Sequence, residues 1–231
     1  MPNATVTAKD GGQFQAYVAE PAALPAPGLV VIQEIFGVNQ VMRDLTDGFA
    51  AQGYLAICPD IFWRIEPGID ITDKTEAEWQ KAFDLFGKFD VDLGVDDLIA
   101  SLEHLRGMAG CTGKAGSVGY CLGGKVAYLM ATRSNADANV SYYGVGLDEL
   151  IAESDAIAKP YLSHVAEKDG FVPPEAQAAF IPALEANPHA VVHVYQGQDH
   201  AFARVGGAHY NKDAAELADG RTQAFLKAHL S

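Results

Sequence analysis

The chain has 231 residues, which at roughly 150 residues per domain favours one large domain over residues 1–231. Hydrophobic residues make up 49% of the chain and charged residues 20%, which excludes a disordered or collagen-like protein. The formal net charge of −14 would repel phosphate backbones and anionic lipids, so we expect no nucleic-acid partner and no membrane surface as a partner. A small anionic substrate remains compatible with this charge, because one local arginine can outweigh the mean field.

The cysteine content and the start of the chain both bear on location. Three widely spaced cysteines, Cys58, Cys111 and Cys121, argue against a disulfide framework and favour a reducing compartment. No apolar run approaches the ~18 residues of a membrane helix, and residues Met1–Thr5 lack the basic and apolar segments of a secretory signal. We therefore expect a cytoplasmic protein. Zinc-binding and nucleotide-binding motifs are missing and no interface is marked, so we expect no metal, no cofactor and a monomer.

Short apolar runs alternate with longer amphipathic patterns along the whole chain. We predict strands at residues 13–19, 29–32, 54–58, 114–120, 140–143, 161–166 and 191–195. We predict helices at residues 41–52, 75–89, 92–106, 123–132, 174–184 and 213–230, with an irregular segment at 60–73. This alternation predicts an α/β fold with a mainly parallel sheet that helices cover on both faces.

One motif between a predicted strand and a predicted helix has the residue spacing of a turn that carries a catalytic nucleophile. Gly119-Tyr120-Cys121-Leu122-Gly123-Gly124 follows the pattern Gly-x-nucleophile-x-Gly, with cysteine at the nucleophile position. Such a turn would place the Cys121 sulfur at the amino end of a helix, which favours the thiolate, and would aim the Leu122 N–H at a developing oxyanion. The alternative is that the glycines only permit close packing and that Cys121 is a small buried apolar residue.

The order of later residues favours the nucleophile interpretation. A nucleophile of this kind requires an acid and then a histidine on loops after later strands. Asp169 follows the predicted strand 161–166, and His200 follows the predicted strand 191–195. Glu167 and Asp199 compete with Asp169 for the role of the acid. Asp199 directly precedes His200 and is poorly placed to orient that ring, so we prefer Asp169.

With these residues in view, the chain resembles the dienelactone hydrolases (carboxymethylenebutenolidases), compact members of the α/β-hydrolase fold without a large lid. The resemblance extends from about Leu29 to the end of the chain. It rests on the segments Gln33–Gly37, Cys58–Asp60, Gly119–Gly124, Tyr142–Gly144, Asp169–Pro173 and Asp199–Arg204. The resemblance implies that Cys121 is the nucleophile, His200 the base and Asp169 its orienting acid, and that Glu34 helps to ionise the cysteine.

The resemblance also implies a substrate site. Ile35 and Leu122 would supply the N–H groups of the oxyanion hole, Arg204 would bind a substrate carboxylate, and Tyr143 would line the site. An alignment without gaps puts Trp79 in place of a second carboxylate-binding arginine and Phe83 in place of a tyrosine.

The sequence departs from the family pattern at one more position, and two other cationic residues could bind a substrate carboxylate. Ala201 replaces the serine that usually follows the histidine, and Arg64 or Lys81 could replace the missing arginine. The helix that carries Trp79 and Phe83 could instead present a buried apolar face, with its aromatic residues in the core.

The expected chemistry is hydrolysis of small enol-lactones or activated esters through a thioester acyl-enzyme. A broader carboxylesterase or thioesterase without preference for a carboxylate is the alternative that Trp79 and Phe83 favour. A third reading is a hydrolase-fold binding protein that has lost catalysis, against which the intact set of cysteine, histidine and aspartate argues.

Overall fold

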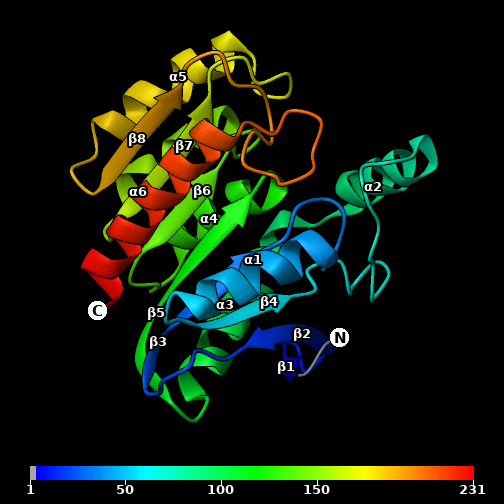
Figure 1. Cartoon of the computed structure of the whole chain (residues 1–231), viewed down its shortest axis with the longest axis vertical. Helices are drawn as coiled ribbons and strands as arrows, with labels where there is room; N and C mark the ends of the chain where they lie inside the picture. The colour runs from blue at the N-terminus through cyan, green and yellow to red at the C-terminus, as the bar shows by residue number, and fades with distance from the viewer. Residues whose placement is uncertain (1–3) are drawn as a thin grey trace. The chain divides into compact units, whose positions relative to one another are not determined.

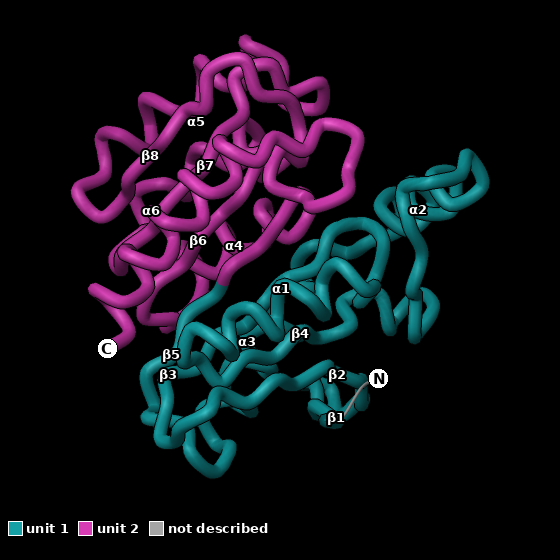
Figure 2. The backbone as a smooth tube through the Cα atoms, in the orientation of Figure 1, with its two compact units in different colours: residues 1–117 teal, residues 118–231 magenta. Residues whose placement is uncertain are grey.

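Figure 1 shows the helices and strands of the computed structural model, which describes residues 4–231. The expectation drawn from Met1–Thr5 falls in part on residues outside this range. The chain divides into two compact units, residues 1–117 and residues 118–231 (Figure 2). The single domain expected over 1–231 stays a prediction.

Unit 1 holds the amino-terminal strands and three helices. Its strands are β1 (Ala4–Thr7), β2 (Gln13–Ala19), β3 (Ala26–Ile32) and β4 (Leu55–Pro59), and its helices are α1 (Gln40–Ala51), α2 (Glu76–Lys88) and α3 (Val91–Gly107). The strands follow the order β1-β2-β4-β3, with β2 antiparallel to β1 and β4, and β3 parallel to β4, and the next strand beside β3 is β5 (Cys111–Tyr120). Nearly all of β3 is buried because α1 and α3 lie on opposite faces of it, which explains its continuous apolar run.

Strand β5 (Cys111–Tyr120) runs from unit 1 into unit 2. Unit 2 continues with α4 (Leu122–Arg133), β6 (Asn139–Tyr142), a 3₁₀ helix η1 (Asp148–Ala156), β7 (Tyr161–Ala166), α5 (Pro174–Glu185), β8 (Ala190–Tyr195) and α6 (Lys212–Leu230). The order here is β5-β6-β7-β8, with β6, β7 and β8 parallel. Over the described residues the strands form a mixed, mostly parallel sheet of eight strands, which confirms the predicted α/β class.

A buried polar network in unit 2 fixes the strands that lead to the candidate site. The ring of His164 on β7 lies 2.8 Å from the hydroxyl of Tyr195 through Nδ1 and 2.9 Å from the hydroxyl of Thr222 through Nε2. Thr222 on α6 also lies 2.7 Å from the hydroxyl of Tyr142 on β6. Burial holds the pKa of His164 well below its usual value, so the ring is neutral. Helix α6 is thereby tied to β6 and β7 directly and to β8 through His164.

Two elements differ from the expectations. Strand β1 was not predicted, because four residues with one buried side chain, Val6, show no clear alternation. Helix η1 was not predicted either, because its sequence DELIAESDA carries four acidic residues and a weak apolar pattern. Among residues 4–231, no helix combines the length and the apolar character that crossing a bilayer requires.

Candidate active site

The turn between β5 and α4 holds Cys121 in a strained backbone conformation. Its φ of 58° and ψ of −116° lie in a region that residues with a Cβ rarely occupy. The Cys121 N–H donates to the Tyr142 carbonyl at 3.0 Å, and the Cys121 carbonyl accepts from the Lys125 N–H at 3.1 Å. The turn is therefore held from both sides, and Cys121 is partly exposed at the start of α4.

Glycines around this turn permit the close approach of α4 and β6. A Cβ at Gly124 would lie 2.6 Å from the Tyr142 carbonyl oxygen and 2.8 Å from the Gly144 Cα. A Cβ at Gly119 would overlap the carbonyl of Gly123 on α4. Both contacts are with backbone atoms that cannot rotate away, so the glycine pattern seen in the sequence is a packing requirement of the turn.

The loops after β7 and β8 bring His200 and Asp169 together. The His200 Nδ1 lies 2.8 Å from Asp169 Oδ2 and 3.0 Å from Asp169 Oδ1. The two side chains are 5% and 1% exposed, and Asp169 Oδ1 also accepts from the Phe171 N–H at 2.8 Å. The rings of Phe171 and Tyr143 meet the His200 ring edge-on at centroid distances of 4.9 and 5.1 Å. The imidazole is thus held in one orientation.

The protonation of His200 depends on Cys121. Burial alone would lower the pKa of the ring, but the negative charge of the Cys121 thiolate and the bond to Asp169 outweigh burial and raise the pKa from 6.5 to about 10. His200 is therefore an imidazolium at neutral pH when Cys121 is ionised. Because Asp169 occupies Nδ1, the second ring nitrogen is the one that can exchange a proton with other groups.

Three further predicted residues lie in unit 2. Tyr143 directly follows β6, has a φ of 39°, and is buried with its ring edge-on to Phe202 at 5.6 Å. Leu122 is the first residue of α4, so its N–H is one of the helix-start groups without an intrahelical acceptor. Arg204 closes the turn after His200, where its N–H donates to the Ala201 carbonyl at 2.9 Å.

The remaining predicted residues lie in unit 1. Glu34 and Ile35 follow β3 and are 4% and 5% exposed. The next residue, Phe36, meets the ring of Trp79 edge-on at 5.0 Å, and Trp79 stacks on Phe83 at 5.5 Å. These contacts form an aromatic row, Phe36–Trp79–Phe83, that runs from the Glu34–Ile35 segment to the surface of α2. The roles of Glu34 and Ile35 toward Cys121 stay predictions.

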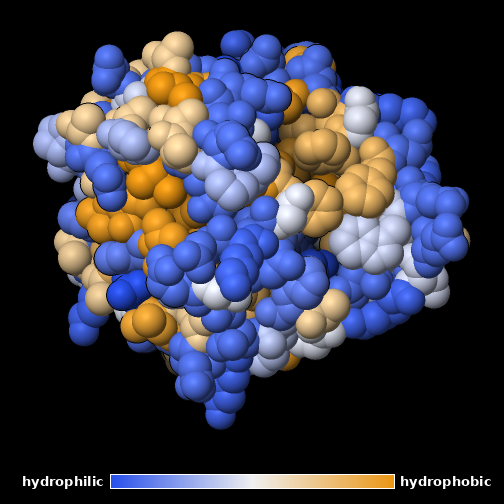
Figure 3. All heavy atoms as spheres, turned by 90° about the horizontal axis from the view of Figure 1, so that it is seen from above, coloured by the Kyte–Doolittle hydropathy of each residue, from blue (hydrophilic) through white to orange (hydrophobic). Residues whose placement is uncertain are grey.

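The exposure of the side chains on α2 tests the alternative that this helix presents a buried apolar face. Phe83 is 46% exposed and Phe86 39% exposed, whereas the buried residues of α2 are Ala82 and Leu85. Figure 3 shows apolar side chains reaching the surface among hydrophilic ones. The prediction that the aromatic residues of this helix are all buried in the core is therefore wrong, and Phe83 is accessible to a ligand.

The two proposed substitutes for the missing arginine are engaged elsewhere. The guanidinium of Arg64 binds both carboxylate oxygens of Asp97 at 2.7 and 2.8 Å, and pairs with Asp10 at 2.6 Å. The ammonium of Lys81 forms an ion pair with Glu66. Arg64 faces two carboxylates at once, so the expectation that it could bind a substrate carboxylate is wrong on electrostatic grounds.

Glu167 and Asp199, which competed with Asp169 in the sequence, bind backbone groups in place of the imidazole. Asp199 Oδ1 accepts from the N–H groups of Gly170 and His200, and Glu167 Oε2 accepts from the Gly197 N–H. Sequence reasoning missed Phe171 as a contact of His200, although it lies in the Asp169–Pro173 segment. It also missed His209, whose Nδ1 lies 3.2 Å from the His200 carbonyl and which no motif marks.

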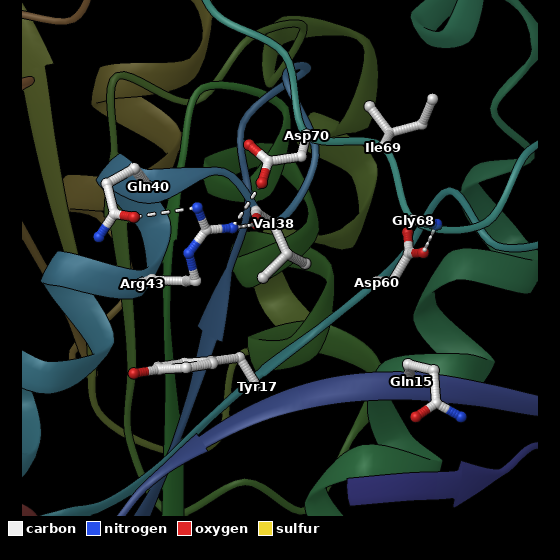
Figure 4. Close-up of a pocket in the computed structure, with 9 residues that line it drawn as sticks. All are labelled: Gln15, Tyr17, Val38, Gln40, Arg43, Asp60, Gly68, Ile69 and Asp70. Atoms are coloured by element: carbon white, nitrogen blue, oxygen red, sulfur yellow. Dashed lines mark hydrogen bonds and ion pairs between the residues drawn. The ribbon is translucent and has the colours of Figure 1, made fainter. Parts of the chain in front are cut away.

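A pocket of about 410 Å³ in unit 1 contains none of the predicted site residues (Figure 4). It is lined by Gln15, Tyr17, Val38, Gln40, Arg43, Asp60, Gly68, Ile69 and Asp70. Arg43 donates to the Val38 carbonyl at 2.6 Å, to Asp70 at 2.8 Å and to Gln40 at 3.0 Å. Asp60 accepts from two backbone N–H groups, one of them of Gly68. The charged groups of this pocket therefore bind its own wall and connect α1 to residues 68–70.

The sheet order, the strained turn after β5 and the residues on the loops after β7 and β8 define the class of α/β hydrolases. The model of the dienelactone hydrolase family matches residues 14–230. A protein of Azospirillum brasilense, named provisionally as a carboxymethylenebutenolidase, is 57% identical over 233 residues and covers 100% of both chains. The carboxymethylenebutenolidase of Pseudomonas putida is 39% identical over 222 residues, covering 96% of this chain and 94% of that one.

A solved structure is also similar to this chain over nearly its whole length. A Klebsiella pneumoniae crystal structure, described provisionally as a dienelactone hydrolase, has a TM-score of 0.84 and 26% identity, covering 98% of each chain. The chain belongs to the dienelactone hydrolase family, as the resemblance implied, and is a hydrolase that acts on carboxylic ester bonds.

Proposed function

We propose that the chain hydrolyses small enol-lactones or activated esters through a thioester acyl-enzyme, with Cys121 as nucleophile and His200 and Asp169 as its acid–base pair. Membership of the family supports hydrolysis of an ester or lactone. The observation that carries the finer proposal is the His200 ring, which contacts Asp169 at 2.8 Å and whose pKa the charge of Cys121 raises. Asp169 thus binds the imidazole directly, and the charge of Cys121 acts on the pKa of the same ring.

The first half of the reaction forms the thioester. With His200 protonated, the Cys121 thiolate attacks the acyl carbon, and the carbonyl π electrons move onto oxygen. The N–H of Leu122, with that of Ile35 as the family resemblance implies, stabilises this oxyanion. As the tetrahedral intermediate collapses, the bond to the leaving oxygen breaks and His200 gives that oxygen its proton. The products of this half are a thioester at Cys121 and a neutral imidazole.

The second half restores the resting site. Neutral His200 removes a proton from water, and the oxygen of that water attacks the thioester carbon. Collapse of the second tetrahedral intermediate breaks the bond to sulfur, so that the acid leaves and the Cys121 thiolate and the His200 imidazolium return. Asp169 holds the ring in the same orientation through both halves and stabilises its positive charge.

The nucleophile also selects the leaving group. A thiolate leaves a tetrahedral intermediate more readily than a simple alkoxide does, so an intermediate formed from an alkyl ester tends to revert to substrate. Enolates, phenolates and thiolates leave readily enough to compete with Cys121. We therefore expect enol-lactones, aryl esters and thioesters to react faster than alkyl esters and amides, with Arg204 binding a carboxylate where the substrate carries one.

A broader carboxylesterase or thioesterase is the second candidate. This candidate is supported by the aromatic row of unit 1. In this row Trp79 replaces the second carboxylate-binding arginine that the family resemblance implies, and Phe83 is accessible. Because Arg64 and Lys81 are paired with carboxylates, unit 1 offers an apolar surface in place of that cation. Such a surface favours neutral, apolar acyl groups over anionic lactones.

Two measurements test these proposals. Hydrolysis of p-nitrophenyl acetate by the wild type and by Cys121→Ala tests the nucleophile, and intact mass after rapid quenching tests for an acetyl group on Cys121. We expect turnover and the adduct in the wild type and neither in the variant; equal turnover in both proteins would refute the triad. A panel of enol-lactones with and without a carboxylate then separates the candidates, because only the first expects a higher kcat/KM for the anionic members.

A further inference from the structure

The two loops that carry Asp169 and His200 are joined by side-chain carboxylates. We name residues 167–172 the acid loop and residues 196–204 the base loop. Asp199 Oδ1 of the base loop accepts from the Gly170 N–H of the acid loop at 3.0 Å. Glu167 Oε2 of the acid loop accepts from the Gly197 N–H of the base loop at 2.7 Å. Each loop is therefore held by a carboxylate of the other.

Backbone hydrogen bonds join the start of the acid loop to the end of β8 and to the base loop. The Glu167 N–H donates to the Tyr195 carbonyl at 3.1 Å, and the Lys168 N–H donates to the Gln198 carbonyl at 2.8 Å. Two residues after Lys168, the Gly170 N–H donates to the Asp199 carboxylate, which joins the loops next to Asp169. Asp199 thus joins the two loops through the backbone N–H of the residue directly after Asp169.

One oxygen of Asp199 binds the backbone of His200 and of the residue directly after Asp169. Asp199 Oδ1 accepts from the His200 N–H at 2.7 Å as well as from Gly170, the residue directly after Asp169. These N–H groups outweigh the effect of partial burial and lower the pKa of Asp199, so the side chain is an anion at neutral pH. His209 lies beside it, with Nδ1 3.6 Å from Asp199 Oδ2.

We propose that Asp199 is a positioning residue, which sets the separation and orientation of Asp169 and His200 by binding the backbone of both loops through one carboxylate oxygen. The inference rests on the proposed roles of Asp169 and His200. Its physical reason is that an acid–base pair must hold its geometry closely, since a misplacement of about 1 Å costs about 10²-fold in rate. Without the Asp199 oxygen, the N–H groups of Gly170 and His200 lose this acceptor, and the positions of Asp169 and His200 are held less closely.

The kinetic test uses a substitution with a matched rescue and a matched control. Asp199→Ala removes the acceptor, Asp199→Asn keeps an oxygen that can accept the same two N–H groups, and Asp155→Ala removes an exposed aspartate of η1 in the same unit. With p-nitrophenyl acetate we expect Asp199→Ala to lower kcat about 10- to 100-fold and to change KM less than about twofold. Asp199→Asn should restore kcat to within about threefold of the wild type, and Asp155→Ala should leave kcat unchanged.

A spectroscopic test separates this inference from the proposed function. In the Cys121→Ala background, the low-field proton resonance of the His200 Nδ1–H bond to Asp169 reports the geometry of the pair without turnover. We expect this resonance to persist when Asp199→Asn is added and to shift or broaden when Asp199→Ala is added. A wild-type kcat and an unchanged resonance in Asp199→Ala would overturn the inference. Full activity of Cys121→Ala would refute the proposed function, while the resonance would still decide the role of Asp199.

Discussion

The His200 Nδ1 lies within 3.0 Å of both carboxylate oxygens of Asp169, and both side chains are almost fully buried. A single N–H shared between two oxygens limits how far the ring can move relative to the carboxylate. Asp169 Oδ1 is itself bound by the Phe171 N–H, so the carboxylate cannot rotate freely about its own bond. The orientation of the ring is therefore set by the backbone of the acid loop.

Asp169→Asn tests how much this carboxylate contributes. The amide keeps the volume but loses the negative charge that favours the imidazolium, and its NH₂ group can present a donor where Nδ1–H needs an acceptor. We expect kcat for p-nitrophenyl acetate to fall by about 10²- to 10⁴-fold. Asp155→Asn is the control for a charge change on the surface of the same unit, and circular dichroism checks the fold. A kcat within twofold of the wild type would contradict this role.

The pKa of His200 should depend on Cys121. The pKa is raised from 6.5 to about 10 in the folded protein, with the thiolate among the causes, so Cys121→Ala should lower it. The pKa of His200 is higher in the folded protein than in the unfolded chain, so protonation of this ring stabilises the folded state. This contribution is fully present below about pH 6.5 and is lost as pH rises toward 10. An NMR titration of the His200 ring in both proteins measures the shift. Identical titration curves would show that the sulfur does not act on the ring.

The parts predicted from the sequence are those that local rules determine. Strand–helix alternation marked the parallel core, and the glycines around Cys121 marked a turn where a Cβ would meet backbone atoms. The chain order of nucleophile, acid and histidine singled out Asp169 and His200, whose side chains the structure brings together, while the catalytic roles of Cys121, Asp169 and His200 remain predictions. Glu34, Ile35 and Arg204 came only from the family resemblance, and their roles remain predictions, as do the monomeric state and the cytoplasmic location.

The parts that were missed depend on contacts between residues distant in sequence. Arg64 was offered as a substitute for the missing arginine, but Asp97, 33 residues later, binds its guanidinium through both carboxylate oxygens. Asp199 was weighed as a competitor for the imidazole, whereas its carboxylate binds Gly170, 29 residues earlier. Neither contact has a periodicity or a motif, because one depends on how a loop packs against α3 and the other on how two loops pack.

Gly124→Ala should destabilise the protein by about 1–3 kcal/mol. The added Cβ would lie 2.6 Å from the Tyr142 carbonyl oxygen, so α4 must move away from β6 or the turn at Cys121 must distort. Gly220→Ala on α6 is the matched control, since a Cβ there meets nothing within 4 Å, and alanine should stabilise the helix by roughly 0.5–1 kcal/mol. Urea unfolding of both variants measures the two free energies. Equal effects of the same sign would contradict the packing argument.

Thr222→Val tests the buried network beneath the site loops. Valine keeps the shape of threonine but removes Oγ1, which lies 2.9 Å from His164 Nε2 and 2.7 Å from the Tyr142 hydroxyl. The Tyr142 hydroxyl keeps its bond to Asp219, so the loss falls mainly on His164, whose Nε2 remains buried without this partner. We expect the free energy of unfolding to fall by about 1–3 kcal/mol in urea titrations. The exposed Thr112→Val should change it by less than about 0.5 kcal/mol, and equal values for both variants would show that the network contributes no net stability.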